Sequence, residues 1–263
     1  MISPLAYVDK EARIGANVTI HPFAYIDKNV EIGDNCTIMP YASILSGTRM
    51  GTDNIIYQGA IIGATPQDFK FKGEDTLLKI GNHNTIREKV ILNRGTNTTD
   101  CTIIGDGNFL LEGVHLAHDT HLGSHCVLGN GAKTAGNCII DDKAILGSEV
   151  IVKHGCRIGS WALLRDGCRA NKDVPPYIVA AHNPISYYGI NALILAKEGH
   201  LTENVIDNIA KCYRQIYQCG TSLENALRRI KDIIPLSPEI TYLVDFIEQS
   251  KNCLLYTSPS PRD

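Results

Sequence analysis

The 263-residue chain has no strong excess of charge of either sign. Its formal net charge is -3, so no overall positive field would draw it to nucleic acid or to a membrane surface, and any basic site must be local. No apolar run is long enough to span a bilayer, and residues 1–5 lack the basic and apolar regions of a signal peptide. We therefore expect a cytoplasmic protein with no transmembrane segment and no nucleic-acid partner.

Paired cysteine motifs are also absent, although the chain has nine cysteines. No two of them form a CxxC motif, which argues against a structural zinc site and a disulfide framework and favours a reducing compartment. Hydrophobic residues make up 44% of the chain and charged residues 20%, as in globular proteins. The length allows one large domain or two smaller ones.

What the chain does have is an aliphatic residue at almost every sixth position. A period of six fits neither an α-helix nor a plain strand, whereas a short strand followed by a turn explains it. Three hexads would make one triangular coil, and stacked coils would lie about 4.8 Å apart. We predict a parallel β-helix. The aliphatic members of the series are Ile14, Ile20, Ile26, Ile32, Ile38, Ile44, Met50, Ile56, Ile62, Ile80, Ile86, Leu92, Ile104, Leu110, Leu116, Leu122, Leu128, Ile140, Leu146, Val152, Ile158 and Leu164.

A column of small residues accompanies the aliphatic one, two positions before it, and would let the backbone corner close over the aliphatic stack. Many of the cysteines belong to this column, so we interpret them as small buried hydrophobes and not as ligands or nucleophiles. They are Cys36, Cys126, Cys138, Cys156 and Cys168.

The repeat is interrupted at about residues 64–79 and 94–102, and it resumes each time in the same phase. These interruptions are therefore predicted to be loops on a continuing stack, and a long polar loop on a rigid scaffold is more often functional than a tolerated insertion. We assign residues 1–187 to the β-helix and 188–252 to a helical domain. Its helices would be capped by Thr202, Ser222 and Ser237.

Residues 253–263 read like a translated sequencing adapter, so we treat them as a non-native tail and exclude them from the argument.

One short segment concentrates candidate chemistry. In residues 114–119, His115 and His118 stand three residues apart, and Asp119 follows directly. The alternative without a catalytic role is that they are solvated turn histidines, which is how we interpret His121 and His125.

The hexads, a long loop with Gln67 and Asp68, the His-x-x-His-Asp run, a Val-Pro-Pro-Tyr segment at 174–177 and a helical C-terminal region occur in this order. Over residues 2–252 this combination resembles the acyl-carrier-protein-dependent UDP-N-acetylglucosamine O-acyltransferases. The resemblance implies a left-handed β-helix and a homotrimer. It also implies transfer of a (3-hydroxy)acyl chain from acyl-carrier protein to the 3-hydroxyl of UDP-N-acetylglucosamine, the first step of lipid A biosynthesis. Neither a metal nor a cofactor is implied beyond the phosphopantetheine on the carrier protein.

The resemblance also assigns roles to the residues of the His-x-x-His-Asp run. It makes His118 the general base, Asp119 the group that orients it or stabilises the imidazolium, and His115 a residue lining the site. Gly136 matches the glycine whose backbone N–H stabilises the oxyanion. The repeat supports this assignment independently, because Gly136 lies one coil after His118 in the same column and should be its stacked neighbour.

Further site residues follow from the same resemblance. Gln67 and Asp68 would contact the sugar, and Asn191 would lie near the acyl chain or the cofactor arm. His154 falls in the column of His118 two coils on, where it would line the groove or only fill a corner. Nearby, Arg157, Arg165, Arg169 and Lys172 form a basic run, which is either a solvated face or a contact for the acidic carrier protein.

Several positions depart from the family pattern and leave donor preference open. Asn93 and Asn137 stand where histidines are expected, Lys153 and His154 replace a His-Gln pair, and Leu193, Lys197 and Glu198 replace a glutamate and two arginines. Asp166 stands where the family has a small residue near the end of the acyl groove, so chain length could differ.

Three alternatives compete with this interpretation. A trimeric zinc carbonic anhydrase needs two histidines five residues apart, and the sequence has no such pair. The glucosamine N-acyltransferase of the same pathway carries a domain before its β-helix, whereas here the repeat already holds at Ile2 and Val8. A non-catalytic or altered-substrate paralogue acting as a binding scaffold would explain the departures.

Overall fold

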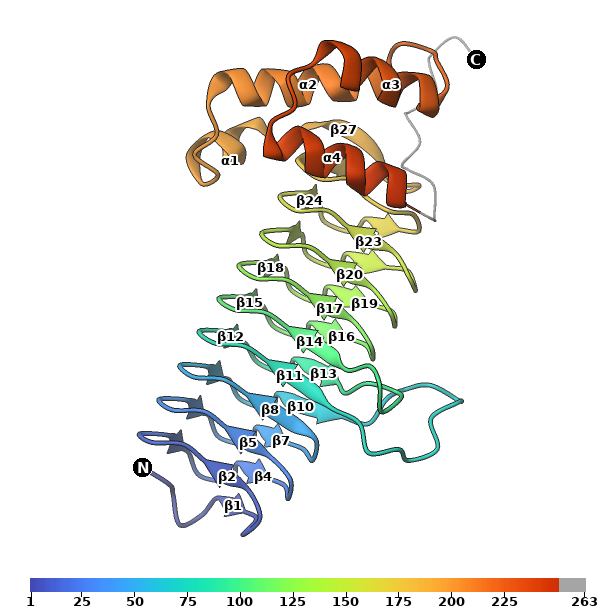
Figure 1. Cartoon of the computed structure of the whole chain (residues 1–263). Coiled ribbons are helices and arrows are strands. Elements are labelled where there is room, and N and C mark those ends of the chain that lie inside the picture. The colour runs from blue at the N-terminus through green and yellow to red at the C-terminus, as the bar shows by residue number, and fades with distance from the viewer. Residues whose placement is uncertain (251–263) are drawn as a thin grey trace.

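The computed structural model describes residues 1–250, which form a long three-sided β-helix followed by four α-helices (Figure 1). Its strands are very short, and each coil contributes one strand to each of three sheets. We call these sheets I, II and III. Every strand pair is parallel except the last pair of sheet III, β26 and β27, which is antiparallel.

The strands are distributed as follows. Sheet I contains β1 (Tyr7–Val8), β4 (Tyr25–Ile26), β7 (Ser43–Ile44), β10 (Ile61–Ala64), β13 (Ile91–Asn93), β16 (His115–Leu116), β19 (Lys133–Thr134), β22 (Ile151–Val152) and β25 (Arg169–Ala170). Sheet II contains β2 (Arg13–Ile14), β5 (Glu31–Ile32), β8 (Thr48–Met50), β11 (Leu78–Ile80), β14 (Thr102–Ile104), β17 (His121–Leu122), β20 (Ile139–Ile140) and β23 (Arg157–Ile158). Sheet III contains β3 (Thr19–Ile20), β6 (Thr37–Ile38), β9 (Ile55–Ile56), β12 (Thr85–Ile86), β15 (Phe109–Leu110), β18 (Val127–Leu128), β21 (Ile145–Leu146), β24 (Leu163–Leu164), β26 (Ile178–Ala181) and β27 (Ser186–Ile190).

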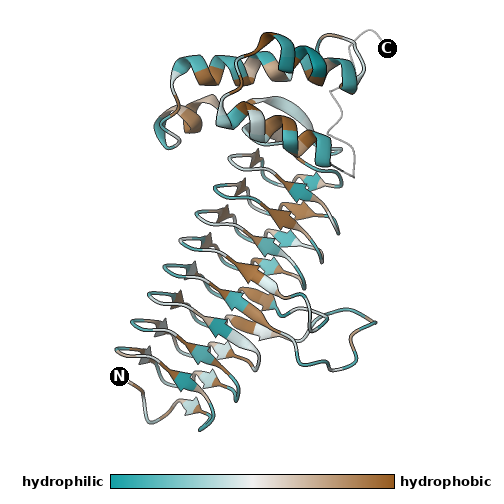
Figure 2. Cartoon of the chain, viewed as in Figure 1, coloured by the Kyte–Doolittle hydropathy of each residue, from teal (hydrophilic) through white to brown (hydrophobic). Residues whose placement is uncertain are grey.

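The register of the sheets stacks the aliphatic column on itself. Ile26 pairs with Ile44 and Leu92 pairs with Leu116, and all four side chains are fully buried. Each such side chain contributes roughly 1.5–3 kcal/mol of hydrophobic stabilisation. Hydrophobic residues recur along the strands from coil to coil, as Figure 2 shows. The six-residue period thus predicted the core correctly.

The five cysteines of the small-residue column are buried, as the sequence predicted, and their thiols are free. Burial raises the pKa of the Cys126 and Cys138 thiols to about 12. Thiols that stay protonated at neutral pH are poor nucleophiles and poor metal ligands, so these residues act as small hydrophobes.

The two interruptions of the repeat are loops, which the structure bounds at residues 65–77 and 94–101. The longer one projects from the side of the β-helix (Figure 1). Their bases are joined by backbone hydrogen bonds: the Arg94 N–H donates to the Ala64 carbonyl at 3.0 Å, and the Gly95 N–H donates to the Leu77 carbonyl at 3.0 Å. The loops therefore share one attachment to the stack.

The helices α1 (Ala192–Lys197), α2 (Glu203–Tyr217), α3 (Leu223–Ile233) and α4 (Pro238–Gln249) cover the C-terminal end of the β-helix (Figure 1). As predicted, Thr202, Ser222 and Ser237 cap α2, α3 and α4, each accepting a backbone N–H three residues later. The domain boundary expected after residue 187 falls within β27, so the transition runs through this hairpin strand. The expected tail at 253–263 lies outside the described residues.

The helical region is tied to the last coils by polar contacts. The Tyr242 hydroxyl donates to Asp141 Oδ2 at 2.6 Å and accepts the Ser160 N–H at 3.0 Å. Ser250 Oγ donates to Asp173 Oδ2 at 2.6 Å. No helix within residues 1–250 is long and apolar enough to cross a membrane.

Candidate active site

His118 lies in the turn between β16 and β17, at the corner where sheet I passes into sheet II. The next residue, Asp119, has a positive φ of 57°, a conformation that Asp adopts more readily than most residues. Both residues are only 8% exposed. The sharp corner therefore holds a histidine and a carboxylate side by side and mostly out of water.

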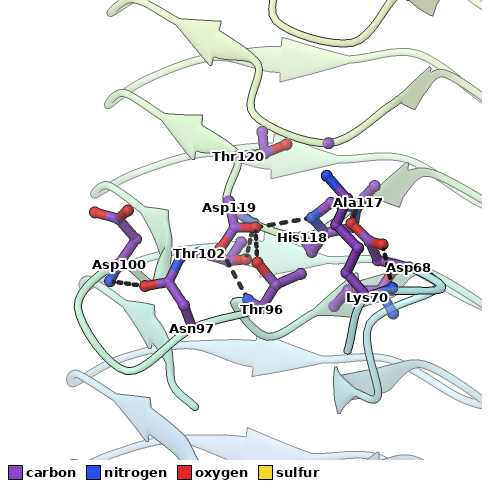
Figure 3. Close-up of polar contacts among 12 residues, drawn as sticks. Asp68, Lys70, Thr96, Asn97, Asp100, Thr102, Ala117, His118, Asp119 and Thr120 are labelled. Atoms are coloured by element: carbon purple, nitrogen blue, oxygen red, sulfur yellow. Dashed lines mark hydrogen bonds and ion pairs between the residues drawn. The ribbon is translucent and has the colours of Figure 1, made fainter. Parts of the chain in front are cut away.

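His118 Nδ1 lies 2.8 Å from Asp119 Oδ2 (Figure 3). An ionised carboxylate can only accept, so Nδ1 carries the hydrogen and donates it. In the neutral imidazole, Nε2 then carries a lone pair and can take a proton. Nε2 lies 3.8 Å from Asp68 Oδ2, on loop 65–77, so the basic nitrogen is directed toward that loop.

Three further contacts hold Asp119. The Thr96 N–H donates to Oδ1 at 2.9 Å, the Thr96 hydroxyl donates to Oδ2 at 2.7 Å, and the Asp119 N–H donates to Thr102 Oγ1 at 2.9 Å. Burial raises the pKa of the Asp119 carboxyl, but the hydrogen bonds from Thr96 and His118 outweigh it, and the pKa lies below its ordinary value. Asp119 is therefore an anion at neutral pH.

Gly136 lies directly against the His118 imidazole. A Cβ added to Gly136 would lie 2.4 Å from His118 Cε1 and 2.7 Å from Nε2, closer than real Cβ atoms approach other groups. One coil separates the two residues, and the Asn137 N–H donates to the His118 carbonyl at 3.0 Å. The Gly136 N–H donates no hydrogen bond to any other residue in 1–250, so it can serve a ligand.

His115 is held by a hydrogen bond that the sequence did not predict. Its Nε2 lies 2.7 Å from Asn93 Oδ1, while Asn93 Nδ2 donates to the Thr65 carbonyl at 2.7 Å. Because the Asn93 amide nitrogen faces a carbonyl, its oxygen faces His115, and Nε2 of His115 carries the hydrogen. Burial, and to a lesser extent the Lys133 charge, lowers the pKa of His115, which is therefore neutral at neutral pH.

The remaining predicted site residues differ in their placement. Asp68 is half-buried beside His118, and its Oδ1 accepts the Lys70 N–H at 2.8 Å, whereas Gln67 is exposed. His154 is exposed at the corner that carries Gly136. Of these three residues, Asp68 approaches His118 Nε2, at 3.8 Å.

Asn191 lies apart from the other predicted site residues. It is buried immediately before α1, where its Nδ2 donates to the Trp161 carbonyl at 3.1 Å. Trp161 belongs to the turn between β23 and β24, at the corner between sheets II and III. A single chain therefore does not bring Asn191 together with His118.

The family models match most of this architecture. The model described as "Udp N-acetylglucosamine O-acyltransferase; Domain 2" matches residues 173–255, and that described as "Bacterial transferase hexapeptide (six repeats)" matches residues 11–40, 29–64 and 101–136.

Two curated proteins named acyl-[acyl-carrier-protein]–UDP-N-acetylglucosamine O-acyltransferase are similar over nearly their whole length. The one from Halorhodospira halophila is 44% identical and covers 97% of this chain and 98% of its own. The one from Thermodesulfovibrio yellowstonii is 38% identical and covers 95% of each chain. The chain belongs to the UDP-N-acetylglucosamine O-acyltransferase family.

Solved structures of family members give the same result. The UDP-N-acetylglucosamine acyltransferase from Bacteroides fragilis is 50% identical, with a TM-score of 0.95 over 97% of this chain and 100% of that one. The enzyme from Francisella novicida is 33% identical, with a TM-score of 0.94 over 99% of this chain and 95% of that one. These similarities confirm the predicted left-handed β-helix with a C-terminal helical region.

The positions that depart from the family pattern fall into two groups. Asn93 is fully buried and makes the hydrogen bonds described above. The others are exposed, and Leu193 is 77% exposed on α1. The exposed positions are Asn137, Lys153, Leu193, Lys197 and Glu198. Asp166 is also exposed, and its Oδ1 accepts the Ser148 N–H at 2.8 Å, a contact between neighbouring coils.

The basic run does not form one patch. Arg157 lies on sheet II, where Nη2 is 2.9 Å from Asp141 Oδ2 and the guanidinium lies over the Phe246 ring at 4.5 Å. Arg169 lies on sheet I, and Arg165 stacks on the Tyr188 ring at 4.2 Å. The run therefore does not form one face of the β-helix, because consecutive strands belong to different sheets, and its contact with a carrier protein stays a prediction.

Thr96 and Thr102 are site residues that the sequence did not single out. Thr96 lies within the second interruption and therefore outside the six-residue pattern. Thr102 begins β14 and stands two residues before Ile104, in the column of small residues, but that position alone does not indicate a contact with Asp119. Among residues 1–250 no group of three or more His, Cys, Asp or Glu side chains is arranged to hold a metal ion.

Proposed function

We propose that the protein transfers a (3-hydroxy)acyl chain from the thioester of acyl-carrier protein to the 3-hydroxyl of UDP-N-acetylglucosamine, the first step of lipid A biosynthesis. The two curated relatives carry the name of this activity. The observation that carries the proposal is the buried His118–Asp119 pair, packed on Gly136, with Nε2 directed at loop 65–77.

The chemistry follows from the placement of these groups. His118 Nε2 takes the proton of the sugar 3-hydroxyl as its oxygen attacks the thioester carbonyl carbon. The carbonyl oxygen becomes an oxyanion that accepts the Gly136 N–H, and Asp119 stabilises the imidazolium. When the tetrahedral intermediate collapses, the C–S bond breaks, and the phosphopantetheine sulfur leaves with the proton from Nε2. A positioned base contributes typically 10²–10⁴-fold, and one oxyanion donor about 10²–10³-fold.

The loop that faces His118 supplies the sugar contacts. Asp68, 3.8 Å from Nε2, is placed to accept a hydrogen bond from a sugar hydroxyl, and the exposed Gln67 amide can bond the same ring. The acyl donor arrives on the phosphopantetheine of the carrier protein, and a thioester is already activated. Direct transfer in a ternary complex therefore needs no covalent intermediate.

We also propose that the protein works as a cytoplasmic homotrimer. Sheet III presents partly exposed apolar side chains along its outer face, and such surfaces are typical of subunit interfaces. The apolar side chains are Ile55, Phe109, Val127, Ile145 and Leu163.

The non-catalytic alternative is not favoured. The chain is 38–44% identical to curated acyltransferases over about 95% of its length. The His118–Asp119 pair, Gly136 and loop 65–77, to which the resemblance assigns the site, also lie together in the structure. The substitution that enters the site, Asn93, keeps a hydrogen bond to His115.

Purified protein should be incubated with UDP-N-acetylglucosamine, or its amino-sugar analogue, and hydroxyacyl-carrier proteins of several chain lengths. We expect acyl transfer to the 3-hydroxyl, and His118→Ala should reduce turnover by roughly 10²–10⁴-fold with the oligomer intact. His121→Ala, an exposed histidine on the neighbouring strand, is the matched control and should retain activity. Retention of full turnover by His118→Ala would refute the assigned base.

A further inference from the structure

We propose that Thr96 is the positioning residue of the catalytic pair: it holds both oxygens of the Asp119 carboxylate and so fixes the direction and tautomer of the His118 imidazole (Figure 3). The inference rests on the proposed function, because it presumes that His118 is the base. It adds a group on loop 94–101 to a site otherwise built on the β-helix and on loop 65–77.

The contacts of Thr96 make a two-point clamp. Its backbone N–H binds Oδ1 at 2.9 Å, and its hydroxyl binds Oδ2 at 2.7 Å, the same oxygen that accepts the His118 N–H at 2.8 Å. The torsion that turns a carboxylate is soft, so one hydrogen bond alone does not fix it. Two donors on different oxygens leave it one orientation.

The clamp matters because Asp119 is nearly closed to solvent, with its side chain 5% exposed. Water therefore has little access to replace the Thr96 hydroxyl. Without that hydroxyl, Thr96 holds the carboxylate only through its N–H on Oδ1, and rotation about the Cβ–Cγ bond of Asp119 can carry Oδ2 away from His118. The imidazole would then lose the acceptor that keeps the hydrogen on Nδ1.

Thr96 is itself rigidly held. The preceding residues are fixed at the base of loop 65–77, where the Arg94 and Gly95 N–H groups bind backbone carbonyls and Arg94 Nε donates to Thr76 Oγ1 at 3.1 Å. A Cβ at Gly95 would lie 3.0 Å from Asp119 Oδ1, so a glycine lets the segment approach the carboxylate this closely. The loop proposed to bind sugar and the clamp on the base thus share one anchor.

Thr96 acts on the Nδ1 side of the ring, whereas the reaction takes place at Nε2. Its two hydrogen-bond donors are both used on Asp119, so it is a positioning residue and not a catalytic one. Loss of the hydroxyl should therefore lower kcat while the KM for each substrate changes little. A misplacement of about 1 Å at a reacting group can cost on the order of 10²-fold.

The test compares three variants assayed for acyl transfer. Thr96→Val keeps the shape and the N–H but removes the hydroxyl, and kcat should fall roughly 10- to 100-fold with both KM values within about twofold. Thr96→Ser restores the donor and should recover most of kcat. Thr99→Val is the control, because the Thr99 hydroxyl bonds Asn97 Oδ1 at 2.7 Å in the same loop and does not touch Asp119.

A second readout does not depend on activity. In protein labelled with ¹⁵N-histidine, the His118 signals are identified by their loss in His118→Ala, and their shifts report which ring nitrogen carries the hydrogen. The native protein and Thr96→Ser should show the Nδ1–H form, and Thr96→Val should show a mixture. Thermal unfolding checks that each variant is folded, and Thr96→Ala serves as the second variant if the valine does not fit.

The outcomes separate the two proposals. Native kcat, or an unchanged Nδ1–H form, in the variants that lack the hydroxyl would overturn the clamp even if His118 is the base. An equal loss of kcat in Thr99→Val would also overturn it, because any change in the loop would then suffice. Full activity of His118→Ala would instead overturn the assigned base, while the labelled spectra would still decide whether Thr96 sets its tautomer.

Discussion

Replacing Gly136 with alanine tests whether the position of the imidazole limits the reaction. The new Cβ would lie 2.4 Å from His118 Cε1, and the three atoms nearest to it all belong to the His118 ring. Gly136 is not among the glycines with positive φ, so alanine adopts this backbone conformation without strain. The backbone N–H that we assign to the oxyanion remains. The variant therefore changes one contact, that between residue 136 and the base.

The size of the effect follows from that distance. Carbon atoms in contact lie about 3.5–4.0 Å apart, so the imidazole must retreat by roughly 1 Å. A displacement of that size at a reacting group costs on the order of 10²-fold in rate. Crowding of a packed site typically costs about 1–3 kcal/mol of stability. We expect kcat to fall by about 100-fold and the free energy of unfolding to fall by an amount within that range.

The assay is a double-mutant cycle with Gly136→Ala and His118→Ala, in which urea unfolding is measured for all four proteins. If the clash involves only the imidazole, the alanine at 136 should destabilise the native background and have little effect once residue 118 is alanine. Equal destabilisation in both backgrounds would show that the backbone requires the glycine. Native kcat in Gly136→Ala would show that the ring can move without consequence, and either result would refute the reasoning.

Three further predictions concern the loops, the helical region and the thiols. Asn93→Leu removes the hydrogen-bond acceptor of His115 and the hydrogen bond to loop 65–77. An unpaired buried polar group costs about 1–3 kcal/mol, so steady-state kinetics should show the KM for the sugar nucleotide raised about tenfold, with kcat within a few-fold of the native value. Tyr242→Phe loses two hydrogen bonds that hold α4 against the β-helix. Urea unfolding should show that the free energy of unfolding falls by about 1–3 kcal/mol, while turnover per folded enzyme is unchanged. Peptide mapping after a thiol reagent at pH 8 should find the exposed Cys219 modified and Cys126, whose pKa burial raises to about 12, unmodified until the protein unfolds.

Much of the fold follows from the sequence because the β-helix is nearly one-dimensional. Residues one coil apart become neighbours, so the contact between Gly136 and His118 can be predicted by counting along the chain. The helix starts at Thr202, Ser222 and Ser237 were also predictable, because each cap depends on residues within one turn of the chain.

Contacts made by the loops could not be predicted in this way. Loop 94–101 breaks the period, so nothing in the six-residue pattern indicates that Thr96 reaches Asp119. The bond from Asn93 to the Thr65 carbonyl likewise depends on how loop 65–77 leaves the stack. Such contacts are set by three-dimensional packing, and a local pattern carries no information about them.

The Asn93–His115 bond also distinguishes the two neighbouring histidines, of which we propose His118 as the base. His118 donates to an anion, Asp119, which favours accumulation of positive charge on its ring during proton transfer. His115 donates to a neutral amide, and burial together with the Lys133 charge lowers its pKa. In the proposed reaction, a proton taken from the sugar would have an anionic partner beside His118 and only a neutral amide beside His115. Asn93, although it departs from the family pattern, pairs His115 with a neutral amide. The carboxylate of Asp119 is the partner of His118, so the two imidazoles have different environments.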